Sequence, residues 1–337
     1  MKTLYIKQEN IPVWFQALTE AHDRVLAPVH KGRGVEFSSV REYSQVAPPQ
    51  DYVQTVRSAK EALFPRTEVL FSYEKDGRDV RVADFDPATV PTTVLWQVRP
   101  CDAASVFPLD AVFNWDYRDK LYNARREKTA IVAVSCARCD DSCFCTSVNG
   151  SPGNTAGSDI LLTMTPDGAI VEVSTPQGEK LIALSENLFE PDASQAKAEY
   201  LADIPQVFDL EQLKARITSL FDSPVWKEQS ERCLGCGACA YVCPTCSCFD
   251  MQDCTKGSQG SRIRCWDSCG FALFTLHTSG HNPRPTQATR WRQRLMHKFS
   301  YIPERENSLG CTGCGRCSRA CPVDMNLKEH LISMTVK

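Results

Sequence analysis

The sequence predicts an α+β protein, with an N-terminal α/β domain over residues 1–222 and a more helical domain over residues 223–337. Three observations support this prediction. The first part alternates β-rich apolar runs with amphipathic stretches, which is the pattern of alternating strands and helices. One cysteine pattern occurs twice in the last third of the chain. The long segment between the two copies contains helical periodicity, so helices are expected to carry both cysteine loops.

Periodicity and turn residues predict the elements of the N-terminal domain. Residues 51–64 are expected to form a helix, because apolar residues follow one of its sides. Asp76-Gly77 and Pro166-Asp167-Gly168 separate β-rich runs and predict two hairpins. The expected strands are 68–73, 79–83, 92–98, 129–135, 160–165 and 169–174, and further helices are expected at 193–202 and 209–220.

The repeated cysteine pattern has the spacing of the ligand run in bacterial ferredoxins. The copies are Cys233-x2-Cys236-x2-Cys239-x3-Cys243-Pro244 and Cys311-x2-Cys314-x2-Cys317-x3-Cys321-Pro322. Each copy places three thiolates on one tight loop, and the fourth cysteine usually reaches across to the other cluster. The expected ligands are Cys233, Cys236, Cys239 and Cys321 for one [4Fe–4S] cluster, and Cys311, Cys314, Cys317 and Cys243 for the second.

Zinc and disulfides are the alternative uses of so many cysteines. Zinc sites usually pair two CxxC units or mix Cys with His, and this spacing does neither. Disulfides require an oxidising compartment, and the N-terminus MKTLYIKQENIPVWF lacks the apolar segment of a secretion signal. We therefore expect a cytoplasmic protein whose 18 cysteines are metal ligands or free thiols.

Five further cysteines lie in the N-terminal domain. Cys101 and Cys136 each follow a predicted buried strand, and α/β sheets bind ligands at such carboxyl ends. Cys139, Cys143 and Cys145 follow Cys136 closely. One shared site is expected, and iron–sulfur is favoured over zinc because the neighbouring domain already carries ferredoxin motifs. The alternative is a set of buried free thiols.

The helix expected at residues 286–299 carries a row of cations beside its apolar side. These cations are Arg290, Arg294 and Lys298. They form either an ordinary solvated face, or a group that offsets the negative charge of a thiolate-ligated cluster or docks an acidic partner. Five cysteines of the same region are unassigned, and most are expected not to be ligands: Cys246, Cys248, Cys254, Cys265 and Cys269.

Composition and missing motifs exclude several classes of function. The net charge of −3 favours neither nucleic acid nor a membrane surface. No apolar run approaches the roughly 20 residues that span a bilayer, so direct membrane insertion is not expected. The chain has no GxGxxG after a strand, no Walker loop and no HExxH. It is therefore expected to need partner subunits and not to turn over a substrate alone.

Several motifs outside the ferredoxin pattern resemble those of one family. In order they are VRPCD (98–102), CFCTS (143–147), GSPGNTAGSD (150–159), CPTCSCFD (243–250), WDSC (266–269) and SGHNPRP (279–285). The chain resembles the iron–sulfur β subunits of cytoplasmic NiFe hydrogenase/sulfur reductases (sulfhydrogenases), to which one of the subunits of anaerobic sulfite reductase is related. The similarity runs from about Tyr52 to Val323.

The resemblance implies three [4Fe–4S] clusters, two of them in an α-helical ferredoxin (4Fe-4S dicluster) domain. By the family pattern, the third is held by Cys101, Cys136, Cys143 and Cys145. Cys139 departs from that pattern, which leaves Cys136, Cys139, Cys143 and Cys145 as a competing set.

The resemblance also implies an electron-transfer subunit between a flavin subunit that reacts with NAD(P)H and a catalytic subunit, either NiFe hydrogenase or sulfur reductase. One alternative is the same chain of clusters in a sulfite reductase or another flavin-based oxidoreductase complex. Another is an iron–sulfur sensor or a zinc scaffold.

Overall fold

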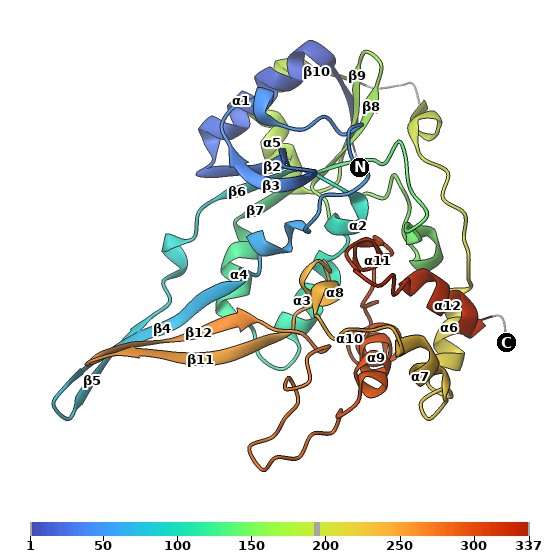
Figure 1. The fold of residues 1–337 in the computed structure, drawn as a ribbon. Coiled ribbons are helices and arrows are strands. Elements are labelled where there is room, and N and C mark those ends of the chain that lie inside the picture. The colour runs from blue at the N-terminus through green and yellow to red at the C-terminus, as the bar shows by residue number, and fades with distance from the viewer. Residues whose placement is uncertain (1, 192–195, 336–337) are drawn as a thin grey trace.

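The structure is a computed structural model that describes residues 2–191 and 196–335. Its larger sheet has eight strands in the order β10-β1-β9-β8-β7-β6-β2-β3 (Figure 1). The pairs β2–β6, β6–β7 and β7–β8 are parallel, and the other pairs are antiparallel. The strands are β1 (Lys2–Lys7), β2 (Arg24–Lys31), β3 (Gly34–Val40), β6 (Thr93–Val98), β7 (Thr129–Val134), β8 (Ile160–Thr165), β9 (Gly168–Val173) and β10 (Phe189–Pro191).

Helices cover both faces of this sheet. Helices α1 (Ile11–Ala21) and α5 (Pro176–Ala183) share one apolar core with it, and the Trp14 indole of α1 donates to the Leu181 carbonyl of α5 over 3.0 Å. Helices α3 (Val106–Asn114) and α4 (Lys120–Glu127) lie on the other face. The central strands β6 and β7 are buried along their whole length, as parallel strands covered on both faces are.

A second, four-stranded sheet projects from the body as an arm (Figure 1). Its order is β11-β12-β4-β5, with β4 (Thr67–Asp76), β5 (Asp79–Asp84), β11 (Phe249–Lys256) and β12 (Gln259–Trp266). Strands β4 and β12 pair although they lie on opposite sides of the domain boundary expected near residue 222. At the base of the arm, the Glu68 carboxylate of β4 accepts from the buried Arg264 of β12.

The C-terminal part is helical around a third apolar core. Helix α9 continues through a π-helical turn (His297–Tyr301) into α10, and α12 packs against α6. Phe144 and Val148 of the N-terminal cysteine loop belong to the same core. The helices are α6 (Leu210–Ile217), α7 (Val225–Ser230), α8 (Ala238–Tyr241), α9 (Gln287–Met296), α10 (Ile302–Glu306), α11 (Arg316–Arg319) and α12 (Leu327–Thr335).

Most sequence-based elements are confirmed, including both hairpins, the strands β6 and β7, and the helices α6 and α9. The helix expected at 51–64 is wrong, because only a 3-10 turn at Ala59–Ala62 forms. The carbonyls of Pro49, Tyr52 and Val53 instead accept from the Arg99 guanidinium. These carbonyls are thus paired with a side chain from outside the segment, which offers them an alternative to helical hydrogen bonds.

The helix expected at 193–202 forms only as a 3-10 turn, Ala196–Tyr200, and residues 192–195 lie outside the described part of the chain. The segment between the two cysteine motifs contains the strands β11 and β12 as well as the expected helix, and these strands were not predicted from the sequence. None of the helices in the described residues is long and apolar enough to cross a membrane.

Candidate iron–sulfur sites

The two ferredoxin-type motifs fold in the same way. Gly235 and Gly313 have φ angles of 67° and 65°, and Gly237 and Gly315 have 74° and 72°. In each motif the two glycines lead into one short helical turn, which is α8 in the first motif and α11 in the second. These two turns pack against each other. Positive φ is costly for residues with a Cβ, so glycine is what lets each loop curl around its sulfurs.

The first set of expected ligands surrounds one cavity. Its wall contains all four expected ligands, Cys233, Cys236, Cys239 and Cys321. Cys317 of the second motif and Cys269 also line it. The Gln287 amide donates to Cys233 Sγ over 3.0 Å, and the Met325 N–H donates to Cys321 Sγ over 3.2 Å. Four sulfurs around a hollow, with N–H groups directed at them, fit a [4Fe–4S] cluster.

The second set is also brought together. Burial raises the pKa of Cys311, Cys314 and Cys317 to about 11, 12 and 11, and the nearby Cys243 thiolate adds to each shift. Cys243 is the fourth cysteine of the other motif, so its position agrees with crossed ligation. Buried thiols of this kind are expected to deprotonate when a metal supplies positive charge.

Parallel strands deliver the N-terminal cysteines. Cys101 lies in helix α2 (Pro100–Ala103), directly after β6, and Cys136 follows the neighbouring strand β7. Burial raises the pKa of Cys136 to about 11 and of Cys145 to about 12, and proximity to other cysteine thiolates contributes to both shifts. Cys143 is among those neighbours. The sequence-based expectation that two strand ends supply one site agrees with this geometry.

Cys139 is placed differently from the other four. Its thiol donates to the Asp203 carbonyl over 3.5 Å. Cys101 accepts instead from the Gln54 amide over 2.9 Å, and its pKa is raised by burial and by Asp102, Cys314 and Cys136. Cys101 and Cys139 both lie near Cys136, so each of the two expected ligand sets has its members in this neighbourhood.

The loop of residues 136–145, called here the N-terminal loop, lies against the second ferredoxin-type loop. The Phe144 N–H donates to the Gly313 carbonyl over 3.0 Å. A Cβ built on Gly313 would lie 2.6 Å from Cys145 Cα, and one on Gly315 would lie 2.4 Å from the Ser142 carbonyl oxygen. The two cysteine loops are therefore in direct backbone contact.

Two members of the predicted basic stripe turn inward. The Arg294 guanidinium donates to the Cys239 carbonyl over 2.8 Å and contacts Cys246 Sγ at 3.5 Å. The Lys298 ammonium lies 3.4 Å from Cys243 Sγ and donates to Thr245 Oγ1 over 2.9 Å. Both cations are buried. The interpretation as a solvated face is wrong for these two residues, whose charges face thiols.

The unassigned cysteines fall into two groups. Cys246 and Cys248 lie close to other thiols, Cys246 to Cys243 and Cys248 to Cys269. The nearby Cys248 thiol lowers the pKa of Cys269 to about 6. Cys254 and Cys265 lie on the arm, where Cys254 is exposed and the Cys265 thiol contacts the Asp250 carbonyl.

Several residues at these sites were not singled out from the sequence. Lys60 donates to the Cys246 carbonyl over 2.8 Å and lies 3.9 Å above the Trp266 ring. Arg319 donates to Cys143 Sγ over 3.1 Å, and Gln54 and Gln287 bind two other sulfurs. No local pattern marks them, apart from the position of Arg319 inside the second motif.

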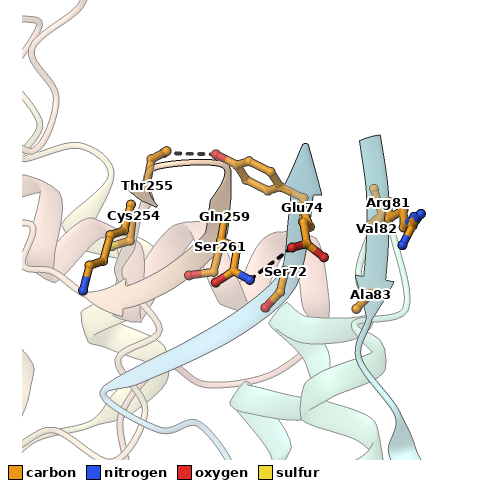
Figure 2. Close-up of a pocket in the computed structure, with 12 residues that line it drawn as sticks. Ser72, Glu74, Arg81, Val82, Ala83, Cys254, Thr255, Gln259 and Ser261 are labelled. Atoms are coloured by element: carbon orange, nitrogen blue, oxygen red, sulfur yellow. Dashed lines mark hydrogen bonds between the residues drawn. The ribbon is translucent and has the colours of Figure 1, made fainter. Parts of the chain in front are cut away.

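A separate hollow lies on the arm (Figure 2). Residues of all four strands line it, and the Tyr73 hydroxyl and the Thr255 hydroxyl hydrogen-bond over 3.1 Å at its edge. Cys254 is the cysteine at this hollow, and the expected cluster ligands line other parts of the molecule. Across the described residues, no three His, Cys, Asp or Glu side chains converge as ligands of a single metal ion.

Paired cysteine loops of this geometry define an iron–sulfur protein, and the family model of the 4Fe-4S dicluster domain matches residues 232–325. Over its length the chain is similar to sulfhydrogenase 2 subunit beta of Pyrococcus furiosus. The two are 32% identical over 340 residues, which covers 98% of this chain and 97% of that protein. The chain therefore belongs to the family of sulfhydrogenase beta subunits, and the resemblance found in its motifs is confirmed.

Proposed function

We propose that this protein is the electron-transfer subunit of a hydrogenase or sulfur reductase complex and that it carries electrons through three [4Fe–4S] clusters. The observation that carries the proposal is the continuity of the three cysteine groups. Cys317 of the second group lines the cavity of the first, and the second loop contacts the N-terminal loop through Gly313 and Cys145. A row of adjacent clusters is the arrangement that electron transfer needs.

We assign the ligands from these contacts. The first cluster is held by Cys233, Cys236, Cys239 and Cys321, and the second by Cys311, Cys314, Cys317 and Cys243. The third is held by Cys101, Cys136, Cys143 and Cys145, with Cys139 outside the set. Support for Cys101 is its position at the end of β6 beside Cys136, and support against Cys139 is its hydrogen bond to Asp203.

The residues around the ligands position the clusters and adjust their potentials. When bound, iron and sulfide supply the one-electron chemistry. Arg294, Lys298 and Arg319 place positive charge near the sulfurs, which favours the reduced, more negative state of a cluster. The backbone N–H groups of Gly313 and Met325 donate to Cys311 and Cys321. These hydrogen bonds also favour the reduced state of a cluster.

The partners we propose are a flavin subunit that reacts with NAD(P)H on one side and a catalytic subunit, hydrogenase or sulfur reductase, on the other. Support comes from the relative, which is described as a beta subunit of a sulfhydrogenase. The 18 free cysteines are consistent with a reducing, cytoplasmic setting. The second candidate is the same chain of clusters serving a sulfite reductase or another flavin-based complex.

Isolation of the native complex under anaerobic conditions tests this proposal. Co-purification of a NiFe large subunit with a flavoprotein, and reduction of the clusters by NAD(P)H only when the flavoprotein is present, is the expected result. A complex that contains a flavoprotein but a sulfite reductase in place of the hydrogenase would favour the second candidate. Clusters that NAD(P)H reduces without any partner would contradict the proposed role.

A further inference from the structure

An exposed loop lies beside the cavity of the first expected cluster. It comprises residues 270–285, between β12 and α9, and it extends away from the body in Figure 1. We call it the outer loop. Its start packs on the first ferredoxin-type loop: a Cβ built on Gly237 would lie 2.5 Å from the Phe271 ring, and one on Gly235 would lie 3.4 Å from the Gly270 carbonyl oxygen. A molecule that contacts the outer loop therefore comes close to the first cluster site.

The Asn282 side chain holds the outer loop in shape. Its amide N–H donates to the Ala272 carbonyl over 2.7 Å. Its carbonyl oxygen accepts from the Thr275 hydroxyl over 2.8 Å and from the Arg284 N–H over 3.0 Å. Asn282 belongs to the SGHNPRP motif, whose role cluster ligation does not explain. Because the loop is already ordered by these contacts, a partner that binds it does not bear the full cost of ordering it.

The outer loop presents leucine side chains to solvent. Leu273 is 73% exposed and Leu276 is 47% exposed. Leu234 of the first ferredoxin-type loop is 67% exposed and adjoins Gly235, against which the outer loop packs. Cys236, an expected ligand of the first cluster, is exposed as well. We call Leu234, Leu273 and Leu276 the leucine patch, and apolar side chains gathered at the surface in this way mark a contact with another molecule.

The surroundings of the leucine patch are positively charged. Residues 268–303 contain no Asp or Glu and five cations, which are Arg284, Arg290, Arg292, Arg294 and Lys298. The last two are buried against thiols, whereas Arg284 and Arg290 are half-buried. Arg290 lines the cavity of the first cluster, and its guanidinium donates to the Arg284 carbonyl over 3.1 Å. Glu231 and Asp324 are the acids nearest to the first set of ligands in sequence, and Arg232 adjoins Glu231. The positive excess favours a partner with an acidic surface.

We propose that the leucine patch and its cationic rim dock a small acidic one-electron carrier protein, which exchanges electrons with the first cluster. The size of the patch favours a carrier that binds and leaves, because permanent subunit interfaces are larger and more apolar, whereas redox encounters are small. The proposal rests on the proposed electron-transfer function and adds a mobile partner to the flavin and catalytic subunits. The step transfers one electron, which the carrier loses and the first cluster gains, and no bond forms or breaks.

Anaerobic stopped-flow spectroscopy on the full-length, cluster-loaded protein tests the proposal. A reduced acidic ferredoxin, freed of excess reductant, is the carrier. Reduced methyl viologen, a small cation that needs no docking surface, is the reference donor. The second-order rate constant with ferredoxin should fall as the salt concentration rises, because salt screens the attraction between opposite charges. The rate constant with methyl viologen should not show this fall.

Two substitutions test the patch and its rim separately. Leu273→Glu should lower the ferredoxin rate constant by about tenfold, because it removes an apolar contact and places a negative charge against an acidic partner. Arg284→Gln should lower it by about threefold and weaken its dependence on salt. The iron content and the methyl viologen rate constant should stay at wild-type values in both variants.

The matched controls lie far from the outer loop in the chain. Leu184→Glu changes a leucine that is 42% exposed at the end of α5, and Arg81→Gln changes an exposed arginine on the arm. Both should leave the ferredoxin rate constant unchanged. A fall in these controls equal to that in Leu273→Glu and Arg284→Gln would show that overall charge, rather than the leucine patch, sets the rate, and would overturn the proposal.

Hydrogen exchange of the native complex distinguishes a mobile carrier from a permanent subunit. We expect the amides of residues 272–281 to exchange as fast in the complex as in the isolated chain. Strong protection in the complex would show that a subunit covers the outer loop, and would overturn the proposal. A wild type that methyl viologen reduces but ferredoxin does not would also overturn it. Iron-loaded protein that neither donor reduces would instead refute the electron-transfer function.

Discussion

Arg316 and Asp102 form a buried ion pair that joins the second ferredoxin-type loop to the N-terminal domain. Both side chains are 2% exposed. The Arg316 guanidinium also donates to the Thr55 carbonyl over 2.9 Å and to the Thr55 hydroxyl over 2.8 Å. Asp102 follows Cys101, and Arg316 lies between Cys314 and Cys317. This pair therefore fixes the position of two cysteine groups relative to each other.

Asp102→Asn should destabilise the protein strongly. The substitution leaves the Arg316 cation buried without its counter-charge, and breaking a buried ion pair in this way costs about 3–5 kcal/mol. We expect a lower denaturant midpoint in urea, followed by circular dichroism under anaerobic conditions. Glu127→Gln is the matched control, because its ion pair with Arg118 is exposed and should contribute less than about 1 kcal/mol. Equal effects of the two substitutions would contradict a structural role for the Arg316–Asp102 pair.

Gly313→Ala should separate the N-terminal loop from the second ferredoxin-type loop. Its φ angle is +65°, and the new Cβ would lie 2.6 Å from backbone atoms of Cys145. Gly77→Ala provides the control, since Gly77 has a φ angle of +59° but open space around its Cβ position. We expect iron loss and reduced stability in Gly313→Ala, and only the backbone cost of about 1 kcal/mol in Gly77→Ala. Full iron content in Gly313→Ala would show that the loop contact is dispensable.

Cys321→Ser should damage the cluster of the first loop. Cys321 belongs to the second motif in sequence, but it lines the cavity of Cys233, Cys236 and Cys239. Electron paramagnetic resonance of the reduced protein and its iron content are the measurements, with Cys265→Ser on the arm as the control. Damage restricted to the cluster of residues 311–317 would refute crossed ligation.

Lys298→Met should make the potential of the second cluster more negative. The Lys298 ammonium lies 3.4 Å from Cys243 Sγ, and its charge favours the reduced cluster. A unit charge at about 4 Å contributes roughly 4 kcal/mol at an effective dielectric constant of 20, so the shift should be on the order of 100 mV. Redox titration measures it, with Lys75→Met on the exposed arm as the control. An unchanged potential at full iron content would contradict this role.

The strands and hairpins of the N-terminal domain could be predicted because each depends on local signals. Residues 129–135 form a continuous apolar run, and Pro166-Asp167-Gly168 marks a turn. The arm could not be predicted fully, since β11 is exposed over most of its length, β12 is mostly half-buried, and neither has the apolar alternation of a half-buried strand. Their partner, β4, is distant in sequence. The error in the helix expected at 51–64 has the same origin, because the distant Arg99 binds the carbonyls of Tyr52 and Val53.

The cysteine groups could be predicted because ligand spacing is a local property of the sequence. The contacts that join the groups could not be, because Arg316, Gln54 and Lys60 reach across the fold to partners far away in the chain. The inward orientation of Arg294 and Lys298 depends on where α9 packs, which periodicity alone left open. The proximity of Cys248 and Cys269 likewise depends on the pairing of β11 with β12, beyond whose ends they lie.

The iron, acid-labile sulfide and zinc content of anaerobically purified protein tests the central claim most directly. Three [4Fe–4S] clusters predict about twelve iron and twelve sulfide per chain. About eight of each would leave the N-terminal cysteines as free thiols and would contradict the third cluster. Zinc without sulfide would contradict the electron-transfer function itself.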